Sequence, residues 1–397
     1  MREMIEETRQ TRYHQPVIRD TIGTVRDLAA TIAKRAEEIE QSRQLPADLV
    51  DALAAAGCFR MATPSRYGGD ALPMPGIVAV LAELARADGS VAWVTGQVAL
   101  SQLIIGCCPE PALDEVYAAG PDLLAAGAVA PKGRAVASPG GQWRVSGQWP
   151  YVTGCAHASW FYLNCVVQEG RTLGRTAQGV PQTRIVLVPA AEVRIEDTWQ
   201  VLGLRGTGSH DVRVAGVGCP AYRSFTLAPE DPAAAGALAR IARSSLIIAA
   251  VASGIADGAL TDLVQLARGG KRPALSTQRL SRSPVVQDRL GEAHMTLRAA
   301  QALLATQAAA AGDPDTPADP AQRAELRATA AQVTAMAAQV VDTAYGLSGG
   351  SAVYDTAPVQ RRLRDMRAAT QHFIAGRHSY AALGALLLGE DPETAGF

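Results

Sequence analysis

Two residues of this chain carry groups that could do acid–base or hydrogen-bond chemistry, and they stand far apart in the sequence. His372, in Gln371-His372-Phe373, has an imidazole that titrates near neutrality, so it can donate a hydrogen bond and move a proton. Thr153, at the end of Ser146-Gly147-Gln148-Trp149-Pro150-Tyr151-Val152-Thr153, offers a hydroxyl and a backbone amide. A lone histidine is usually a core or interface residue, and threonine is common in strands, so both structural interpretations stay open.

A glycine-rich segment, Gly203-Leu204-Arg205-Gly206-Thr207-Gly208-Ser209, adds the hydroxyls of Thr207 and Ser209. Its glycines allow the backbone to approach a ligand closely. The segment is not a dinucleotide-binding fingerprint, because the glycine spacing is wrong and no helix of a βαβ unit follows. A plain β-turn is the alternative for both hydroxyl residues.

Composition excludes several classes of function. The formal net charge is −1, so no global field attracts nucleic acid or an anionic membrane. The six cysteines lack metal-binding or disulfide spacing, and no metal site is predicted; buried thiols in a reducing cytoplasm are the favoured interpretation. The charged N-terminus lacks an apolar signal core. The most apolar stretch, Leu246 to Ala256, is about half the length of a membrane helix. We expect a soluble cytoplasmic protein with neither nucleic-acid nor membrane partners.

The elements that must position these groups change in type along the chain. Residues 20 to about 125 have apolar residues at helical spacing, as in Ile77, Val80, Leu81 and Leu84. Short β-rich runs follow from about 126 to 225. Helical patterns return from about 234, and a last helix is expected from Val359 to Leu388. The predicted strands are Trp143 to Val145, Trp160 to Val167, Arg184 to Val188 and Val212 to Val214; the other long helices are Ala237 to Arg268, Pro284 to Ala311 and Ala321 to Leu347.

This order of elements resembles that of the acyl-CoA dehydrogenase superfamily. The segment that ends at Thr153 is similar to the family's flavin segment, and Arg361-Arg362-Leu363-Arg364-Asp365, preceded by Gly349-Gly350, is similar to its Arg-Asp stretch. The resemblance extends from Val25 to Leu388. It implies an α+β fold with an N-terminal α-helical domain (1–125), a middle β-barrel domain (126–230) and a C-terminal four-helix-bundle domain (231–397).

Within the superfamily, further motifs resemble the hydroxylase branch, which includes the oxygenase of p-hydroxyphenylacetate hydroxylase, dibenzothiophene monooxygenase and natural-product tailoring enzymes. These motifs are Ala87 to Trp93, Ala130 to Ala135, Thr153 to Trp160, Trp199 to Val212, and Arg364-Asp365 followed by His372. The resemblance therefore implies a two-component flavin-dependent monooxygenase, which uses reduced flavin and O2 through a flavin hydroperoxide.

A missing carboxylate supports this branch. An acyl-CoA dehydrogenase needs a carboxylate to remove the α-proton of its substrate. Phe373 occupies the family's usual glutamate position, and residues 232 to 256, which hold the other family location, contain no Asp or Glu. Dehydrogenation by the usual base is therefore disfavoured.

The resemblance also implies roles for individual residues. His372, Thr153 and Trp93 are the predicted catalytic residues, because an imidazole, a hydroxyl and an aromatic wall could shelter an oxygen adduct from water. Trp93, Ser101 and Phe373 are predicted to bind substrate. The predicted cofactor-binding residues are Tyr151, Val152, Thr153, Thr207, Ser209, Arg268, Arg272, Gly349 and Gly350. A solvated helix end explains Arg268, Lys271 and Arg272 equally well, and a buried helix residue explains Trp93.

The implied cofactor is FMN or FAD, in the reduced form supplied by a separate NAD(P)H flavin reductase, since the chain has no nicotinamide motif. In the family, the region of Gly349-Gly350 completes a neighbouring subunit's cofactor site, which implies a homotetramer. The substrate is expected to be an aromatic, heteroaromatic or amine small molecule, with a role in secondary metabolism. Phenol hydroxylases of the branch that this chain resembles carry a phenolate-binding histidine about two turns beyond the tryptophan that corresponds to Trp93. No histidine lies between Thr95 and Cys108, so the resemblance disfavours a simple monophenol. The alternatives are an FAD-dependent acyl-CoA dehydrogenase or oxidase, and a non-catalytic partner with a flavoprotein fold.

Overall fold

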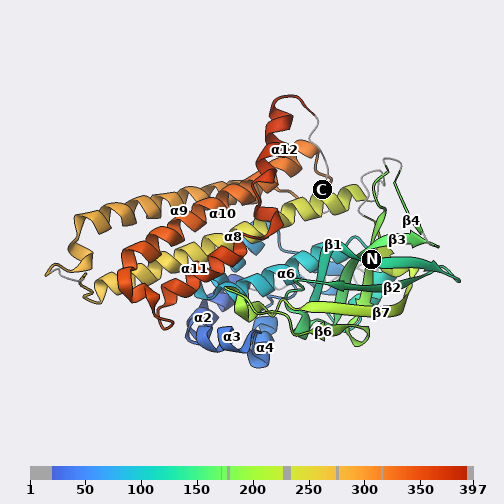
Figure 1. The fold of residues 1–397 in the computed structure, drawn as a ribbon, viewed down its shortest axis with the longest axis horizontal. Coiled ribbons are helices and arrows are strands. Elements are labelled where there is room, and N and C mark those ends of the chain that lie inside the picture. The colour runs from blue at the N-terminus through green and yellow to red at the C-terminus, as the bar shows by residue number, and fades with distance from the viewer. Residues whose placement is uncertain are drawn as a thin grey trace, which may run out of the picture.

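The computed structural model describes residues 20–170, 172–176, 179–226, 234–273, 277–313 and 316–390. The charged N-terminal segment discussed above lies outside these residues. Figure 1 shows a mixed sheet at one end of the long axis, a bundle of long helices at the other, and shorter N-terminal helices beneath their junction. This is the predicted acyl-CoA dehydrogenase-like α+β fold.

The N-terminal helices surround one wholly buried helix. In α6 (Gly89–Ile105) every residue except Gln97 is buried, as expected for a helix that is apolar on all sides. Asp88 caps it, because its carboxylate accepts hydrogen bonds from the amides of Ser90 and Val91. The other helices of this region are α2 (Thr21–Lys34), α3 (Ala36–Ser42), α4 (Ala47–Ala55), α5 (Met74–Ala87) and α7 (Glu110–Val116).

The middle region is one eight-stranded mixed sheet in the order β6-β7-β2-β1-β3-β5-β8, with β4 paired to β3. Its edge strands β6 and β8 do not pair with each other within the described residues. The strands are β1 (Ala125–Ser138), β2 (Gln142–Trp149), β3 (Trp160–Glu169), β4 (Thr172–Leu173), β5 (Thr183–Pro189), β6 (Arg194–Glu196), β7 (Asp211–Pro220) and β8 (Ser224–Phe225).

The four predicted strands lie within β2, β3, β5 and β7, but the sequence analysis missed β1, the strand that pairs with both β2 and β3. Its residues are mostly Ala, Gly and Pro, which have low strand propensity. Close packing explains the small residues: a Cβ on Gly133 would lie 2.0 Å from the ring of Trp149. Trp149 is fully buried and donates its indole N–H to the carbonyl of Asn164 at 2.7 Å.

The C-terminal helices form the bundle around α8 (Ala234–Arg268). This helix is long and apolar enough to cross a membrane, longer than the apolar stretch predicted, yet 78% of its most apolar window is buried inside the protein. It is therefore the central helix of the bundle. The remaining helices are α9 (Pro284–Ala310), α10 (Pro320–Ser348), α11 (Pro358–Ala369) and α12 (His378–Leu387).

The single last helix predicted from Val359 to Leu388 is wrong. The structure breaks it into α11 and α12, separated by the short 3-10 helix η8 (Phe373–Ala375). His372 has an extended backbone (φ −67°, ψ 131°), and its side chain accepts a hydrogen bond from the amide of Ile374. The sequence offers no proline at this point, so periodicity alone runs through the break. The break presents His372 to α6.

Candidate active site

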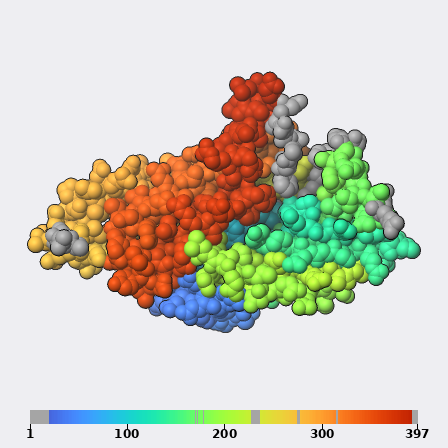
Figure 2. Space-filling model, in the orientation of Figure 1, coloured from blue at the N-terminus to red at the C-terminus, as the bar shows by residue number. Residues whose placement is uncertain are grey.

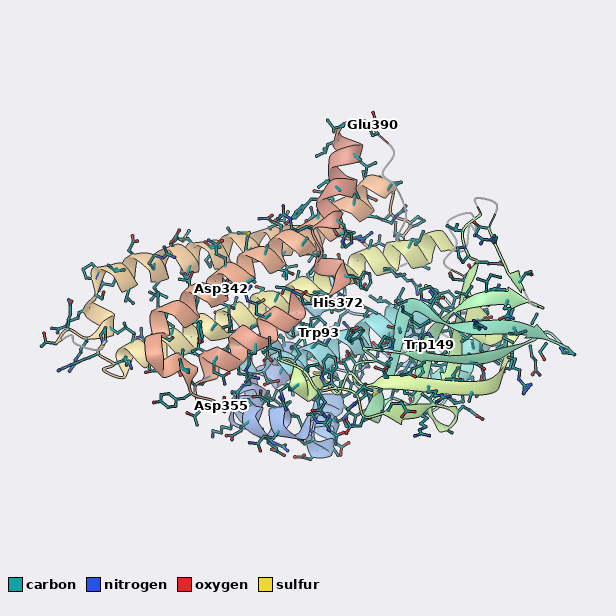
Figure 3. All side chains as sticks on the ribbon, viewed as in Figure 1. Trp93, Trp149, Asp342, Asp355, His372 and Glu390 are labelled. Atoms are coloured by element: carbon teal, nitrogen blue, oxygen red, sulfur yellow. The ribbon has the colours of Figure 1, made fainter. Side chains whose placement is uncertain are left out.

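The site is centred on the first turns of α6. The indole of Trp93 meets the imidazole of His372 edge to face, with ring centroids 5.5 Å apart and an interplanar angle of 73°. The ring of Phe373 stacks on that of His372, with ring centroids 4.9 Å apart. Figure 3 shows Trp93 and His372 next to each other, where the bundle meets the N-terminal helices. Three residues predicted for catalysis or substrate binding are thus brought together.

Burial sets the charge of His372. Desolvation lowers the pKa of His372 to about 4, so the imidazole is neutral at neutral pH. Its Nδ1 accepts from the amide of Ile374 at 3.4 Å, which leaves the proton on Nε2. The side chain therefore presents an N–H donor rather than a positive charge.

A chain of hydroxyls stands behind Thr153. Thr153 Oγ1 and Ser209 Oγ are 2.8 Å apart, and Ser209 Oγ and Thr207 Oγ1 are also 2.8 Å apart. Thr207 Oγ1 donates to the carbonyl of Leu204 at 2.7 Å. Thr207 and Ser209 are buried, whereas Thr153 is half-buried. Of these three linked hydroxyls, only that of Thr153 is open to a ligand.

Two strained residues shape this side of the site. Tyr151 has a φ of 62° and Leu204 has a φ of 52°, values that residues other than Gly, Asn and Asp rarely adopt. Such strain is retained where the surrounding structure over-determines it, often at functional sites. The strained residue Tyr151 is 74% exposed, and its ring meets that of Trp199 edge to face. An exposed ring is free to lie against a planar ligand.

The turn at Thr153 leaves a backbone donor free. The amides on either side are used, because Val152 N donates to the carbonyl of His210 and Gly154 N donates to the carbonyl of Thr207. Thr153 N has no acceptor among the described residues. Thr153 therefore offers both an amide donor and a hydroxyl to a ligand. These groups and the exposed Tyr151 ring fit an isoalloxazine, which has polar ring edges and a flat face.

The Thr153 turn and His372 both contact α6. The position of a Cβ on Gly154 is 3.3 Å from Val94, the residue after Trp93. In the same way, a Cβ on Gly206 would lie 3.1 Å from Ser90. The turn at Thr153, the glycine-rich segment and His372 thus all reach the first two turns of α6.

Asp365 anchors the glycine-rich segment to α11. Its Oδ1 accepts from the amide of Leu204 at 2.6 Å, while the carbonyl of Leu204 accepts from Thr207 and from the indole of Trp199. Burial, with the neighbouring Asp88 carboxylate, raises the pKa of Asp365 to about 7. Asp365 stands in one of the motifs of the sequence but was given no predicted role; an acid directly after a run of arginines was the available signal.

Several predicted site residues are not exposed to this space. Val152 is fully buried in the core of the sheet, so it holds the turn rather than lining a ligand site. Ser101 is also buried: it donates to the carbonyl of Gln97 at 2.7 Å and shares a hydrogen bond with Tyr162. Ser101 is therefore part of the interior, and its predicted contact with substrate is not supported.

The predicted phosphate-binding residues lie at the far end of the bundle. Gly89 packs against Ile255, so Arg268 lies roughly 20 Å further along α8. Next to it, Lys271 donates to the hydroxyl of Ser351, which follows Gly349 and Gly350. We call Arg268, Lys271, Arg272, Gly349, Gly350 and Ser351 the distal cluster. It is separate from the Trp93–His372 site of the same chain.

Comparison with known families agrees with this architecture. The model of the acyl-CoA dehydrogenase N-terminal domain matches residues 16–108, and that of the acyl-CoA dehydrogenase C-terminal domain matches residues 246–377. The chain belongs to the acyl-CoA dehydrogenase family. Both matched parts carry site residues, since the first includes Trp93 and the second includes His372.

Relatives within the acyl-CoA dehydrogenase family identify the branch. The chain is 29% identical to an indole-3-acetate monooxygenase from Pseudomonas putida (95% of this chain, 94% of the relative) and 28% identical to the oxygenase component of an FADH2-dependent resorcinol hydroxylase from Rhizobium (94% and 95%). The structure of XiaF from Streptomyces, in complex with FADH2 and glycerol, superposes with a TM-score of 0.87 at 25% identity over the full length of both chains. This member of the family is a flavin-dependent monooxygenase.

Proposed function

We propose that this chain is the oxygenase of a two-component system that inserts one oxygen atom from O2 into an aromatic, heteroaromatic or amine small molecule. Its reduced FMN or FAD comes from a separate NAD(P)H flavin reductase. The observation that carries the proposal is the meeting, at α6, of a neutral imidazole, an aromatic wall and a turn with a free amide and hydroxyl. Reduced flavin, when bound, supplies the two electrons that activate O2.

The residues on the two sides of the site have different tasks. Thr153 holds the flavin edge through its amide and hydroxyl, and Tyr151 covers a flat face. His372 donates a hydrogen bond through Nε2, because Nδ1 is occupied by the Ile374 amide. Trp93 and Phe373 both pack against the imidazole, and the buried Trp93 shields it from water on its side.

The alternative function as an acyl-CoA dehydrogenase is disfavoured, because the carboxylate that would remove the substrate α-proton is absent from the family's two usual positions. Phe373 stands where the family's glutamate would be, and α8 has no Asp or Glu between Ala234 and Ala256. The nearby buried acids, Asp88 and Asp365, are committed to the amides of Ser90, Val91 and Leu204. Neither acid reaches a substrate from beneath the glycine-rich segment.

In a homotetramer, the distal cluster could bind the flavin of another protomer despite its distance from its own site. The distal cluster is too far along α8 to serve its own protomer's site, but it could contact the phosphate of flavin bound in another protomer. The last helix supports association, since α12 stands out from the body of the molecule (Figure 2) and exposes Leu387 and Leu388 by 79% and 82%. An apolar helix end this exposed favours contact with a second copy.

The substrate is proposed to be larger or less acidic than a simple monophenol. The α6 region beyond Trp93 offers no histidine, and the hydroxyl of Ser101 is satisfied inside the protein. A turnover assay with p-hydroxyphenylacetate, with indole-3-acetate and resorcinol in parallel, tests this point. Efficient ortho-hydroxylation of p-hydroxyphenylacetate would contradict it. A place in natural-product tailoring stays a prediction from the sequence.

The reaction class is tested by mixing the anaerobic complex of protein and reduced flavin with O2 while recording flavin absorbance. We expect a clear delay before the oxidised spectrum returns in the wild type and a shorter delay in His372→Ala. Immediate, featureless reoxidation in the wild type would contradict the proposal. Yellow protein that is reduced by an acyl thioester would instead favour the dehydrogenase or oxidase.

A further inference from the structure

The hydroxyl chain at Thr153 has only one possible hydrogen-bond direction. A carbonyl oxygen accepts and cannot donate, so the single hydroxyl hydrogen of Thr207 must point to Leu204. Thr207 then has only lone pairs to offer Ser209, and Ser209 must donate to it. The single hydroxyl hydrogen of Ser209 is already donated to Thr207, so Thr153 must donate to Ser209. The hydrogen of Thr153 therefore points into the protein, and its lone pairs point toward the ligand.

The hydroxyl chain ends at the carbonyl of Leu204, and hydrogen bonds hold both peptide groups of Leu204 in place. The carbonyl of Leu204 accepts from Thr207 Oγ1 at 2.7 Å, from Thr207 N at 3.2 Å and from Trp199 Nε1 at 3.2 Å. The amide of Leu204 donates to the buried carboxyl of Asp365 at 2.6 Å. These bonds hold a residue with a left-handed backbone, so the carbonyl cannot turn away and release the hydroxyl of Thr207.

We infer that Thr207, Ser209 and Asp365 are positioning residues that make the Thr153 hydroxyl a hydrogen-bond acceptor. This inference rests on the proposed function, in which Thr153 faces the N5 edge of the flavin, as the resemblance to the family's flavin segment implies. N5 of reduced flavin carries a hydrogen and can donate to such an oxygen. N5 of oxidised flavin has only a lone pair, which would face the lone pairs of Thr153. The hydroxyl chain thus contributes to discrimination between the two redox states.

Substitutions in the chain should change this discrimination in a defined way. Ser209→Ala removes the acceptor of the Thr153 hydrogen, so Thr153 can rotate and donate to oxidised flavin. The ratio of the dissociation constants, oxidised over reduced, should fall roughly three- to tenfold, mainly because oxidised flavin binds more tightly. Ser209→Thr keeps a hydroxyl and should keep the ratio. Thr153→Val removes the acceptor itself and should weaken reduced flavin by a similar factor.

The measurement is a titration of the full-length protein with FMN and with FAD, each oxidised in air and reduced under anaerobic conditions. Ser224→Ala is the matched control, because Ser224 is a buried serine of the edge strand β8 whose hydroxyl donates to Ala221. Thermal unfolding of each variant without flavin reports any loss of fold. A merely structural role of Ser209 would weaken both redox states together.

The outcomes separate the inference from the proposed function. A ratio that falls in Ser209→Ala but not in Ser209→Thr or Ser224→Ala supports the inference. An unchanged ratio in Ser209→Ala, with both redox states still bound, overturns it and leaves the proposed function standing. Failure of the wild type to bind any flavin overturns the proposed function and the inference with it.

Discussion

Trp93 and His372, which come from the N-terminal helices and from a break near the C-terminus, meet edge to face with ring centroids 5.5 Å apart. The ring of Phe373 also contacts the imidazole, at 4.9 Å. Desolvation keeps the imidazole neutral at neutral pH. This arrangement suits a hydrogen-bond donor that must stay in place while oxygen is activated.

Removal of the imidazole should uncouple flavin oxidation from product formation. In His372→Ala we expect product formation to fall roughly a hundredfold, because a fixed donor in a dry site is lost. The reducing equivalents should appear as hydrogen peroxide, measured together with product under limiting reduced flavin. His294→Ala on the exposed face of α9 is the control. Equal coupling in His372→Ala and wild type would contradict the assigned role.

The pKa of His372 predicts a stability effect at acid pH. Burial lowers this pKa to about 4, below the value of about 6.5 expected for an unfolded chain. The unfolded state therefore binds more protons between pH 6.5 and pH 4, and His372 makes the free energy of unfolding fall as pH falls through this window. Thermal unfolding of His372→Gln and wild type should diverge there. Parallel pH profiles would show that the imidazole is not desolvated.

The pKa of Asp365 predicts the opposite slope. Burial beside Asp88 raises the pKa of Asp365 to about 7, against an unfolded value of 3.8, despite the nearby Arg361 and Arg364. The folded state therefore binds more protons between pH 3.8 and pH 7, and stability from this group is lost as pH rises. Asp365→Asn stays neutral, so its stability relative to wild type should increase from pH 4 to pH 8. A constant difference in melting temperature would contradict the shift.

The contact between Gly133 and Trp149 predicts that even a substitution by alanine at position 133 lowers the stability of the fold. A methyl group on Gly133 would overlap the Trp149 ring, so Gly133→Ala should destabilise the protein by about 1–3 kcal/mol. Gly218→Ala is the matched control in the same sheet, because its added Cβ would have ordinary contact with Gln142 at 3.4 Å. Denaturant unfolding measures both variants. Equal stability of the two would contradict the packing argument.

The exposed end of α12 predicts how the protein associates. Glutamate at both Leu387 and Leu388 should leave the isolated fold intact, because both side chains are exposed. We expect the double variant to have a smaller mass by light scattering and weaker flavin binding, since the distal cluster would no longer meet a neighbouring site. Lys271→Ala should weaken flavin binding without a change in mass. A wild-type monomer that binds flavin normally would contradict the proposed tetramer.

The sequence by itself determined the kinds of element and their order. Helical and strand periodicities are local properties of the chain, so the long helices and four strands of the middle region could be read directly. The motifs at Thr153 and His372 led to the prediction of the site, and the Phe373 position led to the prediction that the usual base is absent. β1 escaped notice because of its small residues, of which Gly133 is required by its contact with Trp149 and not by strand propensity.

Only the tertiary structure decided how these residues act. The break at His372, the burial that keeps its ring neutral, and the enclosure of Val152 and Ser101 all depend on neighbours distant in sequence. The direction of the hydroxyl chain depends on a carbonyl held by Asp365 from another helix. Burial and hydrogen-bond direction are properties of the packed chain, and no local pattern encodes them.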